Sequence, residues 1–280
     1  MKRLLVLLLA LLVLLPAAKT EEVPSAWREA VLHVPASAMP SAMEEKDGLY
    51  SFLFEDSARS IAYHVELLPG NLHLTSLQMA NNQMKGSARA TYASTKLENL
   101  TKEYYPGTAW QGTYLLKEDG LSRFVLFLLD EEDGNFYRLE YDAATGDMMG
   151  YTVREDLPAE AGNNLLSMKQ AVQAALAFAG QGTLMDVRLV KTENGYIYRV
   201  LLLIGGEEVL VMVDAQTGAC LEEARQATVY QAAGSSRRRS PAQSTGQGAG
   251  GQTAQQAERD VDDDDDDWDD DDDDWDDDDD

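Results

Sequence analysis

The hexapeptide Val213-Asp-Ala-Gln-Thr-Gly218 lies between two apolar segments, and Tyr141-Asp-Ala-Ala-Thr-Gly146 repeats its Asp-Ala-x-Thr-Gly core 72 residues earlier. An Asp side chain accepts hydrogen bonds from backbone N–H groups just ahead of it, and a Gly supplies the positive φ that closes such a turn. A Thr hydroxyl adds to the same network. The repeated pattern therefore predicts a tight turn between antiparallel strands. The predicted turn residues are Asp142, Thr145, Gly146, Asp214, Thr217 and Gly218.

Catalysis is the alternative role for the two Asp residues. A catalytic carboxylate needs a base, a nucleophile or a ligand beside it. Neither Asp142 nor Asp214 has such a residue at a matching position in its own segment. A structural turn is therefore the favoured interpretation.

The residues before the second Asp-Ala-x-Thr-Gly turn predict a helix followed by strands. Ser167-Met-Lys-Gln170 has the form of a capping box, and the apolar residues after it recur at i, i+3 and i+4, which predicts one buried helix face. Gly180 and Gly182 are expected to end this helix. Glu193-Asn194-Gly195 and Gly205-Gly206 are turn signals. The expected strands are Asp186–Val190, Tyr196–Ile204, Val209–Val213 and Ala219–Leu221.

A similar order precedes the first copy. Thr95-Lys-Leu-Glu98 is predicted to be another capping box, with Leu97, Leu100 and Tyr104 on one apolar face of the helix. Pro106-Gly107 is expected to end that helix. The expected strands are Trp110–Leu116, Leu121–Leu129, Asn135–Tyr141 and Asp147–Thr152.

A third, degenerate unit is expected upstream, with Pro69-Gly70-Asn71 at the place of the Asp-Ala-x-Thr-Gly turn. Its expected strands are Leu49–Phe54, Ile61–Leu68 and Leu72–Gln78. Together the patterns predict an α+β fold of tandem small units, each with one helix packed on an antiparallel β-meander. The predicted unit boundaries are 25–90, 93–155 and 163–225.

The best-defined unit resembles a known family. Its capped helix, the strand Tyr198-Arg-Val-Leu-Leu202 and the segment Val211-Met-Val-Asp-Ala-Gln-Thr-Gly218 are similar to the PepSY domain. Residues 165–222 match this pattern well, and residues 93–152 match it less tightly. The resemblance implies a small α/β module, often in tandem, in exported bacterial proteins and in the propeptides of thermolysin-like metalloproteases. It also implies partner binding, with protease inhibition as a proposed activity, and it carries no catalytic residues to assign.

Residues 1–18 are expected to form a signal peptide. Lys2-Arg3 precedes the apolar run Leu4–Leu15, which is shorter than the roughly 20 residues needed to span a bilayer. Pro16-Ala17-Ala18 then favours cleavage after Ala18. We expect an extracytoplasmic protein, secreted or associated with the cell envelope, with membrane contact only if the signal peptide stays uncleaved. The one cysteine, Cys220, is expected to be a small buried residue in a strand.

The sequence offers little catalytic or metal chemistry. His64 and His73 flank a predicted hairpin and could face one another, but a zinc site needs further ligands, and His33 is the one other histidine. The acidic segment 130–134 lacks the ligand spacing of a calcium loop. Phosphate-binding glycine loops, nucleophile elbows and HExxH motifs are lacking. We therefore expect no enzyme and no cofactor. The acidic composition also argues against a nucleic-acid partner.

Most of the net negative charge comes from the C-terminal residues. Residues 262–280 contain 17 Asp together with Trp268 and Trp275, and removing these 17 charges from the formal −26 leaves −9 for the other 261 residues. So many like charges with so few apolar groups predict a disordered acidic tail over 261–280, after a flexible linker over 231–260. The tail is expected to bind Ca²⁺ weakly. The candidate ligands are Asp262, Asp263, Asp264, Asp265, Asp266 and Asp267.

Three functions stay open on these grounds. The leading hypothesis is a non-enzymatic exported binding module for a protein or peptide, acting as a protease inhibitor or regulator if that partner is a protease. The alternative is a cell-surface protein that binds divalent cations through its poly-Asp tail. A hydrolase with a scattered, unrecognised site is the third hypothesis.

Calcium titration tests the tail. Each Ca²⁺ should bind with a dissociation constant of roughly millimolar, because extended carboxylates provide charge without a fixed cage. Binding should be multiple and should weaken as sodium chloride rises. Calorimetric titration of the full chain and of a chain truncated after residue 260 measures the difference. Equal heats from the two proteins would show that the tail is not the cation site.

Overall fold

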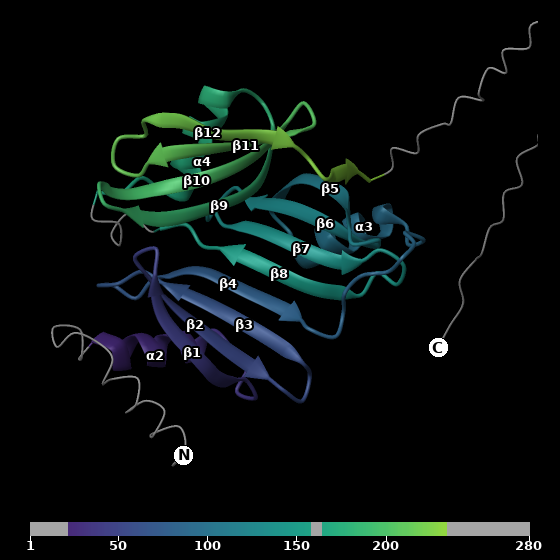
Figure 1. Cartoon of the computed structure of the whole chain (residues 1–280), viewed down its shortest axis with the longest axis horizontal. Coiled ribbons are helices and arrows are strands. Elements are labelled where there is room, and N and C mark those ends of the chain that lie inside the picture. The colour runs from purple at the N-terminus through teal and green to yellow at the C-terminus, as the bar shows by residue number, and fades with distance from the viewer. Residues whose placement is uncertain (1–21, 158–163, 234–280) are drawn as a thin grey trace, which may run out of the picture. The chain divides into compact units, whose positions relative to one another are not determined.

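The computed structural model describes residues 22–157 and 164–233, and within them a helix followed by four strands occurs three times (Figure 1). The first group consists of α2 (Glu22–Leu32), β1 (Met39–Lys46), β2 (Leu49–Asp56), β3 (Ile61–Leu67) and β4 (Leu74–Asn81). The second group consists of α3 (Ser94–Tyr104), β5 (Thr108–Glu118), β6 (Leu121–Asp130), β7 (Phe136–Asp142) and β8 (Met148–Arg154). The third group consists of α4 (Met168–Ala179), β9 (Thr183–Thr192), β10 (Gly195–Ile204), β11 (Glu207–Asp214) and β12 (Cys220–Ala227), and the short strand β13 (Tyr230–Ala232) follows it.

These strands form two antiparallel sheets, one of nine strands in the order β1-β2-β3-β4-β8-β7-β6-β5-β13 and one of four in the order β12-β11-β10-β9. The first two groups join where β4 pairs with β8, and their strand order is mirrored about that pair. A Cβ at Gly150 would lie 2.6 Å from the carbonyl oxygen of Met79, so a larger residue would force these two strands apart. The described residues thus form a mixed α/β fold dominated by antiparallel sheet.

Both α2 and α3 lie on the same face of the nine-stranded sheet. Residues paired across an antiparallel ladder point to the same face. One continuous row of such residues crosses β2, β3, β4, β8, β7 and β6, namely Phe54, Tyr63, Met79, Tyr151, Leu139 and Leu126. Helix α2 packs on one end of this face, where the ring centroids of Trp27 and Phe52 are 5.1 Å apart. Leu97 of α3 packs on the other end with Phe124.

The four-stranded sheet carries α4 and shares its core with the larger sheet. Ser167 accepts a hydrogen bond from the backbone N–H of Gln170, whose side chain accepts one from the backbone N–H of Ser167, so the predicted capping box of α4 is confirmed. The buried residues of α4 are Met168, Ala171, Val172 and Ala175. Residues of the first two groups that complete the same core include Leu49, Leu68, Leu116, Val125, Phe127 and Phe136. The third group therefore does not enclose its core alone.

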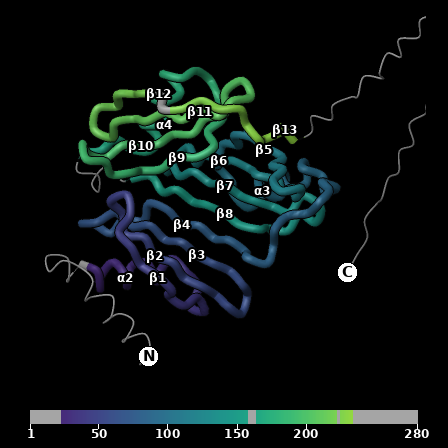
Figure 2. The backbone as a smooth tube through the Cα atoms, in the orientation of Figure 1, coloured from purple at the N-terminus to yellow at the C-terminus, as the bar shows by residue number. Residues whose placement is uncertain are grey.

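The chain returns from the small sheet to the large one at its C-terminal end. After β12, the strand β13 pairs with β5 at the edge of the nine-stranded sheet (Figure 2). Tyr230 of β13 packs against Tyr114 and Phe127, with ring centroids 6.2 and 6.0 Å away. Residues 231 and 232, which fall in the range predicted as a linker, thus belong to a strand. The signal peptide, residues 234–260 of the linker and the acidic tail lie outside the described residues.

The first group contains a strand that the sequence patterns did not predict. β1 pairs with β2 along the edge of the sheet and is mostly exposed, which explains why its sequence lacks an apolar alternation. With β1 included, the turn at Pro69-Gly70-Asn71 lies between the third and fourth strands of its group. The Asp-Ala-x-Thr-Gly turns lie at the same place in the other two groups.

The predicted capping box of α3 is wrong. The helix begins at Ser94, and the preceding residue Ala93 makes no side-chain cap hydrogen bond. Thr95 is therefore already inside the helix, where its backbone is helical and its side chain does not occupy the capping position. Thr95 and Glu98 consequently form no reciprocal pair at the helix start.

The predicted apolar face of α3 is also wrong in part. Leu97 is buried as expected, but Leu100 is exposed and Tyr104 is 73% exposed. Thr101, one turn after Leu97, is buried in their place, and Tyr105 packs on the same cluster. The 11-residue helix therefore rests on the sheet along the Leu97–Thr101 ridge, which turns Leu100 and Tyr104 away from it.

The turn between β11 and β12 is held by one side chain. Asp214 Oδ1 accepts hydrogen bonds from the backbone N–H groups of Gln216 at 3.0 Å and Thr217 at 2.7 Å, and from the Thr217 hydroxyl at 2.8 Å. Gly218 has a φ of 74°, and its N–H donates to the carbonyl oxygen of Asp214 at 2.9 Å. The hydrogen bonds from Thr217, followed by that from Gln216, hold the pKa of Asp214 below its ordinary value.

The turn between β7 and β8 uses the same arrangement. Asp142 Oδ1 accepts from the backbone N–H groups of Ala144 and Thr145, and Gly146 has a φ of 78°. Ser87 adds a hydroxyl donor at 2.8 Å. Burial raises the pKa of Asp142, but the hydrogen bonds from Ser87, Ala144 and Thr145 outweigh it and leave the pKa lowered.

Substitutions at the β11–β12 turn should separate backbone strain from hydrogen bonding. Gly218→Val should lower the free energy of unfolding by about 1–3 kcal/mol, because a β-branched residue is strained at positive φ. Gly218→Asn should cost less, since Asn tolerates this region. Urea unfolding followed by circular dichroism measures both, and equal losses for Val and Asn would contradict the strain argument.

The same turn should contribute stability in a pH-dependent way. Asp214→Ala should cost about 1 kcal/mol through lost hydrogen bonds. Because the folded-state pKa of Asp214 is lowered, its contribution is present above the ordinary value of 3.8 and is lost as the pH falls through the folded-state pKa. The difference between wild type and Asp214→Ala should therefore be larger at pH 7 than at pH 3. A difference that grows on acidification would contradict this assignment.

Candidate functional site

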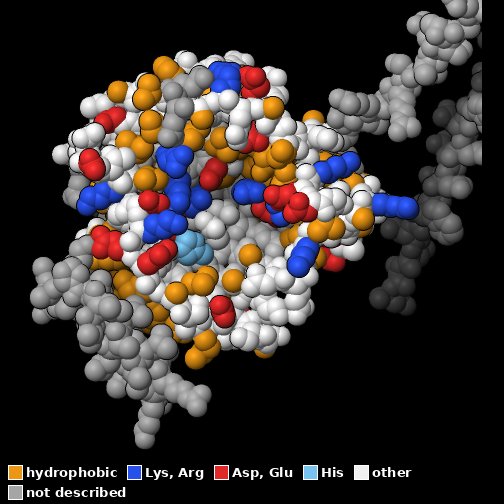
Figure 3. Space-filling view, in the orientation of Figure 1, with side chains coloured by type: hydrophobic (Ala, Val, Ile, Leu, Met, Phe, Trp, Pro, Cys, Tyr) orange, Lys and Arg blue, Asp and Glu red, His pale blue; other side chains and the backbone are white. Residues whose placement is uncertain are grey.

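The face of the nine-stranded sheet opposite α2 and α3 carries polar and small side chains over its central strands. One row of paired residues on this face is Ala42, Leu53, His64, Gln78, Thr152 and Arg138. The neighbouring row is Glu44, Ser51, Glu66, Ser76, Arg154 and Phe136. Lys, Arg, Asp and Glu side chains gather around a hollow in the space-filling view (Figure 3). We call this side of the sheet the open face: its first row is partly or fully exposed, whereas Ser51, Glu66, Ser76, Arg154 and Phe136 of the second row are buried.

Strand β9 meets the open face through charged side chains. Val187 and Leu189 of β9 are buried in the core that contains α4. Asp186 and Arg188 alternate with them, so they project from the opposite side of the strand. This alternation brings one acid and one base of the small sheet against polar residues of the large sheet.

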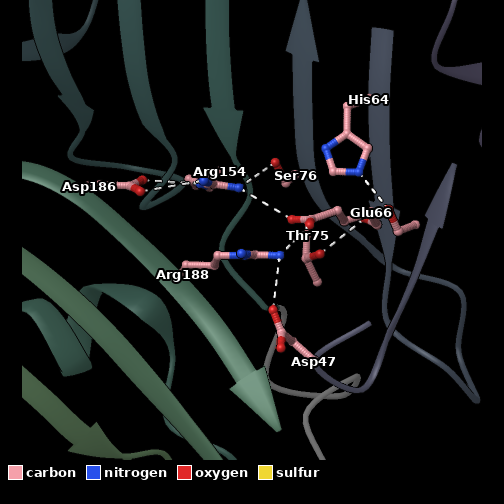
Figure 4. A network of polar contacts seen from close by, with 9 residues as sticks. Asp47, His64, Glu66, Thr75, Ser76, Arg154, Asp186 and Arg188 are labelled. Carbon is pink, nitrogen blue, oxygen red and sulfur yellow. Dashed lines mark hydrogen bonds and ion pairs between the residues drawn. The ribbon is translucent and has the colours of Figure 1, made fainter. Parts of the chain in front are cut away.

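Glu66 lies at the centre of the resulting network (Figure 4). Its side chain is 2% exposed, and its two oxygens lie 3.4 Å from Arg154 Nη1 and 2.6 Å from Arg188 Nη2. Arg154 also donates to the Ser76 hydroxyl, and its Nε lies 3.2 Å from Asp186 Oδ1. A buried carboxylate is tolerated only when such partners replace its lost hydration. Glu66 therefore restricts how the two sheets can dock.

The outer side of the network ties β9 to the β1–β2 turn. Asp47 Oδ2 lies 3.5 Å from Arg188 Nη2, and the carbonyl oxygen of Asp47 accepts a hydrogen bond from the backbone N–H of Lys191 at 2.7 Å. A Cβ at Gly48 would lie 2.3 Å from the Cβ of Lys191, so the turn and the strand are in close contact. These contacts close one border of the open face.

His64 and Ser51 lie on the open face beside Glu66. The Nε2 atom of His64 is 2.6 Å from the hydroxyl oxygen of Ser51. Burial lowers the pKa of His64, Glu66 acts in the opposite direction, and Arg188 and Arg154 add to the lowering. The imidazole is therefore neutral at pH 7. A hollow of about 410 Å³ lies over this pair.

The Ser51–His64 pair lacks the surroundings of a hydrolytic site. Among the described residues, no carboxylate hydrogen-bonds to the second ring nitrogen of His64. The backbone around Ser51 is engaged with β1 and β3, whereas an oxyanion hole needs free N–H groups. The chemistry that this pair can offer is hydrogen bonding to a ligand.

A second charged group lies farther along the open face. Glu140 of β7 lies between two guanidinium groups, with its oxygens 2.7 Å from Arg138 Nη2 and 3.3 Å from Arg123 Nε. The three residues border a hollow of about 360 Å³ that Gln78 and Thr152 also line. We call Arg123, Arg138 and Glu140 the arginine pair site.

The other residues considered for metal or polar chemistry have separate partners. His73 Nε2 is 3.0 Å from the carbonyl oxygen of Asp156, so His73 and His64 bind different groups and do not face each other. His33 lies 3.4 Å from Glu29. Within residues 22–157 and 164–233, no group of three or more His, Cys, Asp or Glu side chains is arranged to hold a metal ion. The candidate calcium ligands 262–267 lie outside these ranges.

The acidic segment 130–134 and Cys220 have local roles. Asp130 Oδ1 accepts hydrogen bonds from the backbone N–H groups of Glu132 and Asp133, which closes the β6–β7 turn. Cys220 is half-buried at the start of β12, and burial raises the pKa of its thiol. None of the helices in the described part of the chain has the length and apolar content needed to cross a bilayer.

Comparison with known proteins gives only a distant likeness. No family model and no curated protein matches the chain. A candidate lipoprotein of Clostridium difficile 630 is 19% identical, with a TM-score of 0.23 over 49% of this chain and 95% of its own. The C-terminal domain of YpeB from Bacillus megaterium is 14% identical, with a TM-score of 0.29 over 73% of this chain and 96% of its own. TM-scores this low carry no argument about the fold or function of this chain.

Sequence reasoning singled out the Asp-Ala-x-Thr-Gly turns and missed the open face. The structure places the six turn residues at the ends of two hairpins, whereas the open face is built by residues within strands. A charged residue inside an apolar strand was the available signal. Glu66 follows Val65 and precedes Leu67, and Arg188 lies between Val187 and Leu189.

Removing the charge of Glu66 should destabilise the protein strongly. Glu66→Gln leaves Arg154 and Arg188 without their buried counter-charge, which should cost about 3–5 kcal/mol in the free energy of unfolding. Asp186→Asn is the matched control, because Asp186 is 37% exposed and its loss should cost about 1 kcal/mol or less. Urea unfolding measures both variants. Equal losses would show that burial of Glu66 is not what makes the network important.

Proposed function

We propose that this chain is an exported, non-enzymatic binding protein whose open face holds a segment of a protein or peptide partner. The observation that carries this proposal is the open face itself. One row of half-buried polar side chains, His64, Gln78, Thr152 and Arg138, extends across the central strands without cover from α2 or α3 and runs beside the buried row that contains Glu66 and Arg154. Charged groups border this surface where β9 contacts the large sheet and at the arginine pair site.

The chemistry of the open face suits a ligand that is polar and extended. The hollows of about 360 and about 410 Å³ have the size of ordinary ligand sites and are lined by polar groups together with Met, Leu and Tyr residues. Because these groups belong to paired strands, they are already held in place before a partner binds. Binding then loses less free energy to ordering of the site.

Export and the class of partner are proposed from the sequence. The pattern of residues 1–18 supports an extracytoplasmic location. The threefold order of a helix and four strands fits tandem PepSY-like units. On that resemblance, an exported protease is the first partner to test, with inhibition or regulation as the consequence of binding.

The alternative function belongs to the C-terminal sequence. The 17 Asp residues within 262–280 favour weak binding of divalent cations at the cell surface. The calcium titration of the full and truncated chains tests this proposal separately from the open face.

Filling the open face should abolish partner capture. Thr152→Trp places a large ring in the middle of the central row, and the immobilised variant should capture at least tenfold less partner from culture supernatant and envelope extract than wild type. Lys96→Trp, on the exposed side of α3, is the control and should capture as wild type does. Quantitative mass spectrometry of the bound proteins measures the ratio. Capture that Thr152→Trp leaves unchanged would contradict the proposed site.

A protease assay separates the binding function from a hydrolytic one. A thermolysin-like protease acting on fluorogenic casein should lose activity in proportion to added wild-type protein, and Thr152→Trp should weaken that inhibition. Cleavage of casein by the wild-type protein alone would instead support the hydrolase hypothesis.

A further inference from the structure

We infer that the arginine pair site recognises a carboxylate side chain on the partner, so that the segment bound on the open face is acidic. This inference rests on the proposed function, since it names the chemistry of the partner at that same face. It starts from the number and arrangement of hydrogen-bond donors around Arg123, Arg138 and Glu140.

The two guanidinium groups have more donors than the carboxylates around them occupy. Arg138 uses Nη2 for Glu140, and the hydroxyl of Tyr230 lies 3.4 Å from the same nitrogen. Arg123 donates from Nη2 to Glu118 at 2.8 Å, whereas its Nε lies 3.3 Å from a Glu140 oxygen as an ion pair without forming a hydrogen bond. Within the described residues, the Nη1 atoms of both arginines have no acceptor, and the buried Nε atoms of Arg123 and Arg138 have no hydrogen-bond partner.

The charge at this site is also incompletely balanced. Glu140 is largely buried and is shared between the two arginines. Glu118 is the other carboxylate in contact, but its side chain is 65% exposed, so water screens its ion pair with Arg123. Two positive charges therefore face one well-held negative charge, and the remaining field favours an incoming anion.

Glu140 acts as a positioning residue for the two arginines. It holds both guanidinium groups from one side, and strand pairing fixes their backbones on β6 and β7. Planar guanidinium groups bind carboxylates through paired N–H donors, and the advantage is greatest when the group is held in advance. Gln78 and Thr152 line the adjacent hollow and can hydrogen-bond to the rest of the ligand.

The occupant that fits these features is an extended segment of another protein with an acidic side chain. The hollow of about 360 Å³ lies beside the polar rows, so a segment lying on the face can place one acidic side chain against Arg123 and Arg138. A basic segment would instead meet two arginines of like charge. The charge of the site therefore selects among partners that the shape of the face admits.

Synthetic peptides test this selection directly. Three fluorescein-labelled octapeptides with alternating Thr and Glu, Thr and Gln, or Thr and Lys would be titrated with the full-length protein by fluorescence anisotropy. The Glu peptide should bind at least tenfold more tightly than the Gln peptide, and the Lys peptide should bind weakest. Binding of the Glu peptide should also weaken as sodium chloride rises.

Variants then locate the effect. Arg123→Gln and Arg138→Gln should each weaken binding of the Glu peptide by about fivefold or more and should leave binding of the Gln peptide nearly unchanged. Arg28→Gln is the matched control, because it removes one positive charge from α2 on the opposite face of the sheet. Circular dichroism and urea unfolding would establish that each variant is folded.

The outcomes distinguish this inference from the proposed function. Equal binding of the Glu and Gln peptides, or Glu-peptide binding that both arginine substitutions leave intact, would overturn the carboxylate site. Partner capture that is lost in Thr152→Trp but retained in the Arg123→Gln, Arg138→Gln double variant would overturn it too, while leaving the proposed binding face in place. Capture that Thr152→Trp does not affect would overturn both.

Discussion

The antiparallel pairing of β4 with β8 is the constraint on which the rest of the architecture depends. Because the fourth strands of the first two groups pair with each other, their eight strands form one sheet, and α2 and α3 fall on the same face. That face buries aromatic and aliphatic residues of one alternation along the inner strands, such as Phe54, Tyr63, Leu126 and Leu139. The side chains on the other face of the sheet must then either be covered by another element or be polar. A shift of one residue in the β4–β8 register would exchange these two sets of side chains.

The third group covers only part of the second face, and this partial cover defines the candidate site. β6 is apolar on both sides, with Phe124 and Leu126 toward α3 and Val125 and Phe127 in the core shared with the third group. On β4 and β8 this face instead carries Gln78 and Thr152, which are half-buried, beside Ser76 and Arg154, which are buried. The open face is therefore the part of the second face that lies beyond the apolar residues covered by the third group.

A buried charge network and the pairing of β13 with β5 hold the two sheets together at different places. Glu66 requires both Arg154 of the large sheet and Arg188 of the small sheet, since a buried carboxylate without them would carry a large desolvation cost. At the other side, β13 joins the edge of the large sheet and places Tyr230 beside Phe127 and Arg138. Binding at the open face would use lining groups that these two attachments keep in position.

The sequence by itself determined the local elements of this protein. The capping box at Ser167, the hairpins of the third group and the Asp-Ala-x-Thr-Gly turns depend on hydrogen bonds between residues a few positions apart, so short patterns predict them. Such patterns failed at Thr95, which lies inside α3 rather than at its cap, and at β1, which is an exposed edge strand without an apolar alternation. Only the tertiary structure decided the β4–β8 pair, the shared core and the open face. Glu66 and Arg188, for example, meet across 122 positions of the chain. Contacts of that kind depend on which strand edges are free and which faces still need cover, and these are properties of the assembled sheets rather than of any segment.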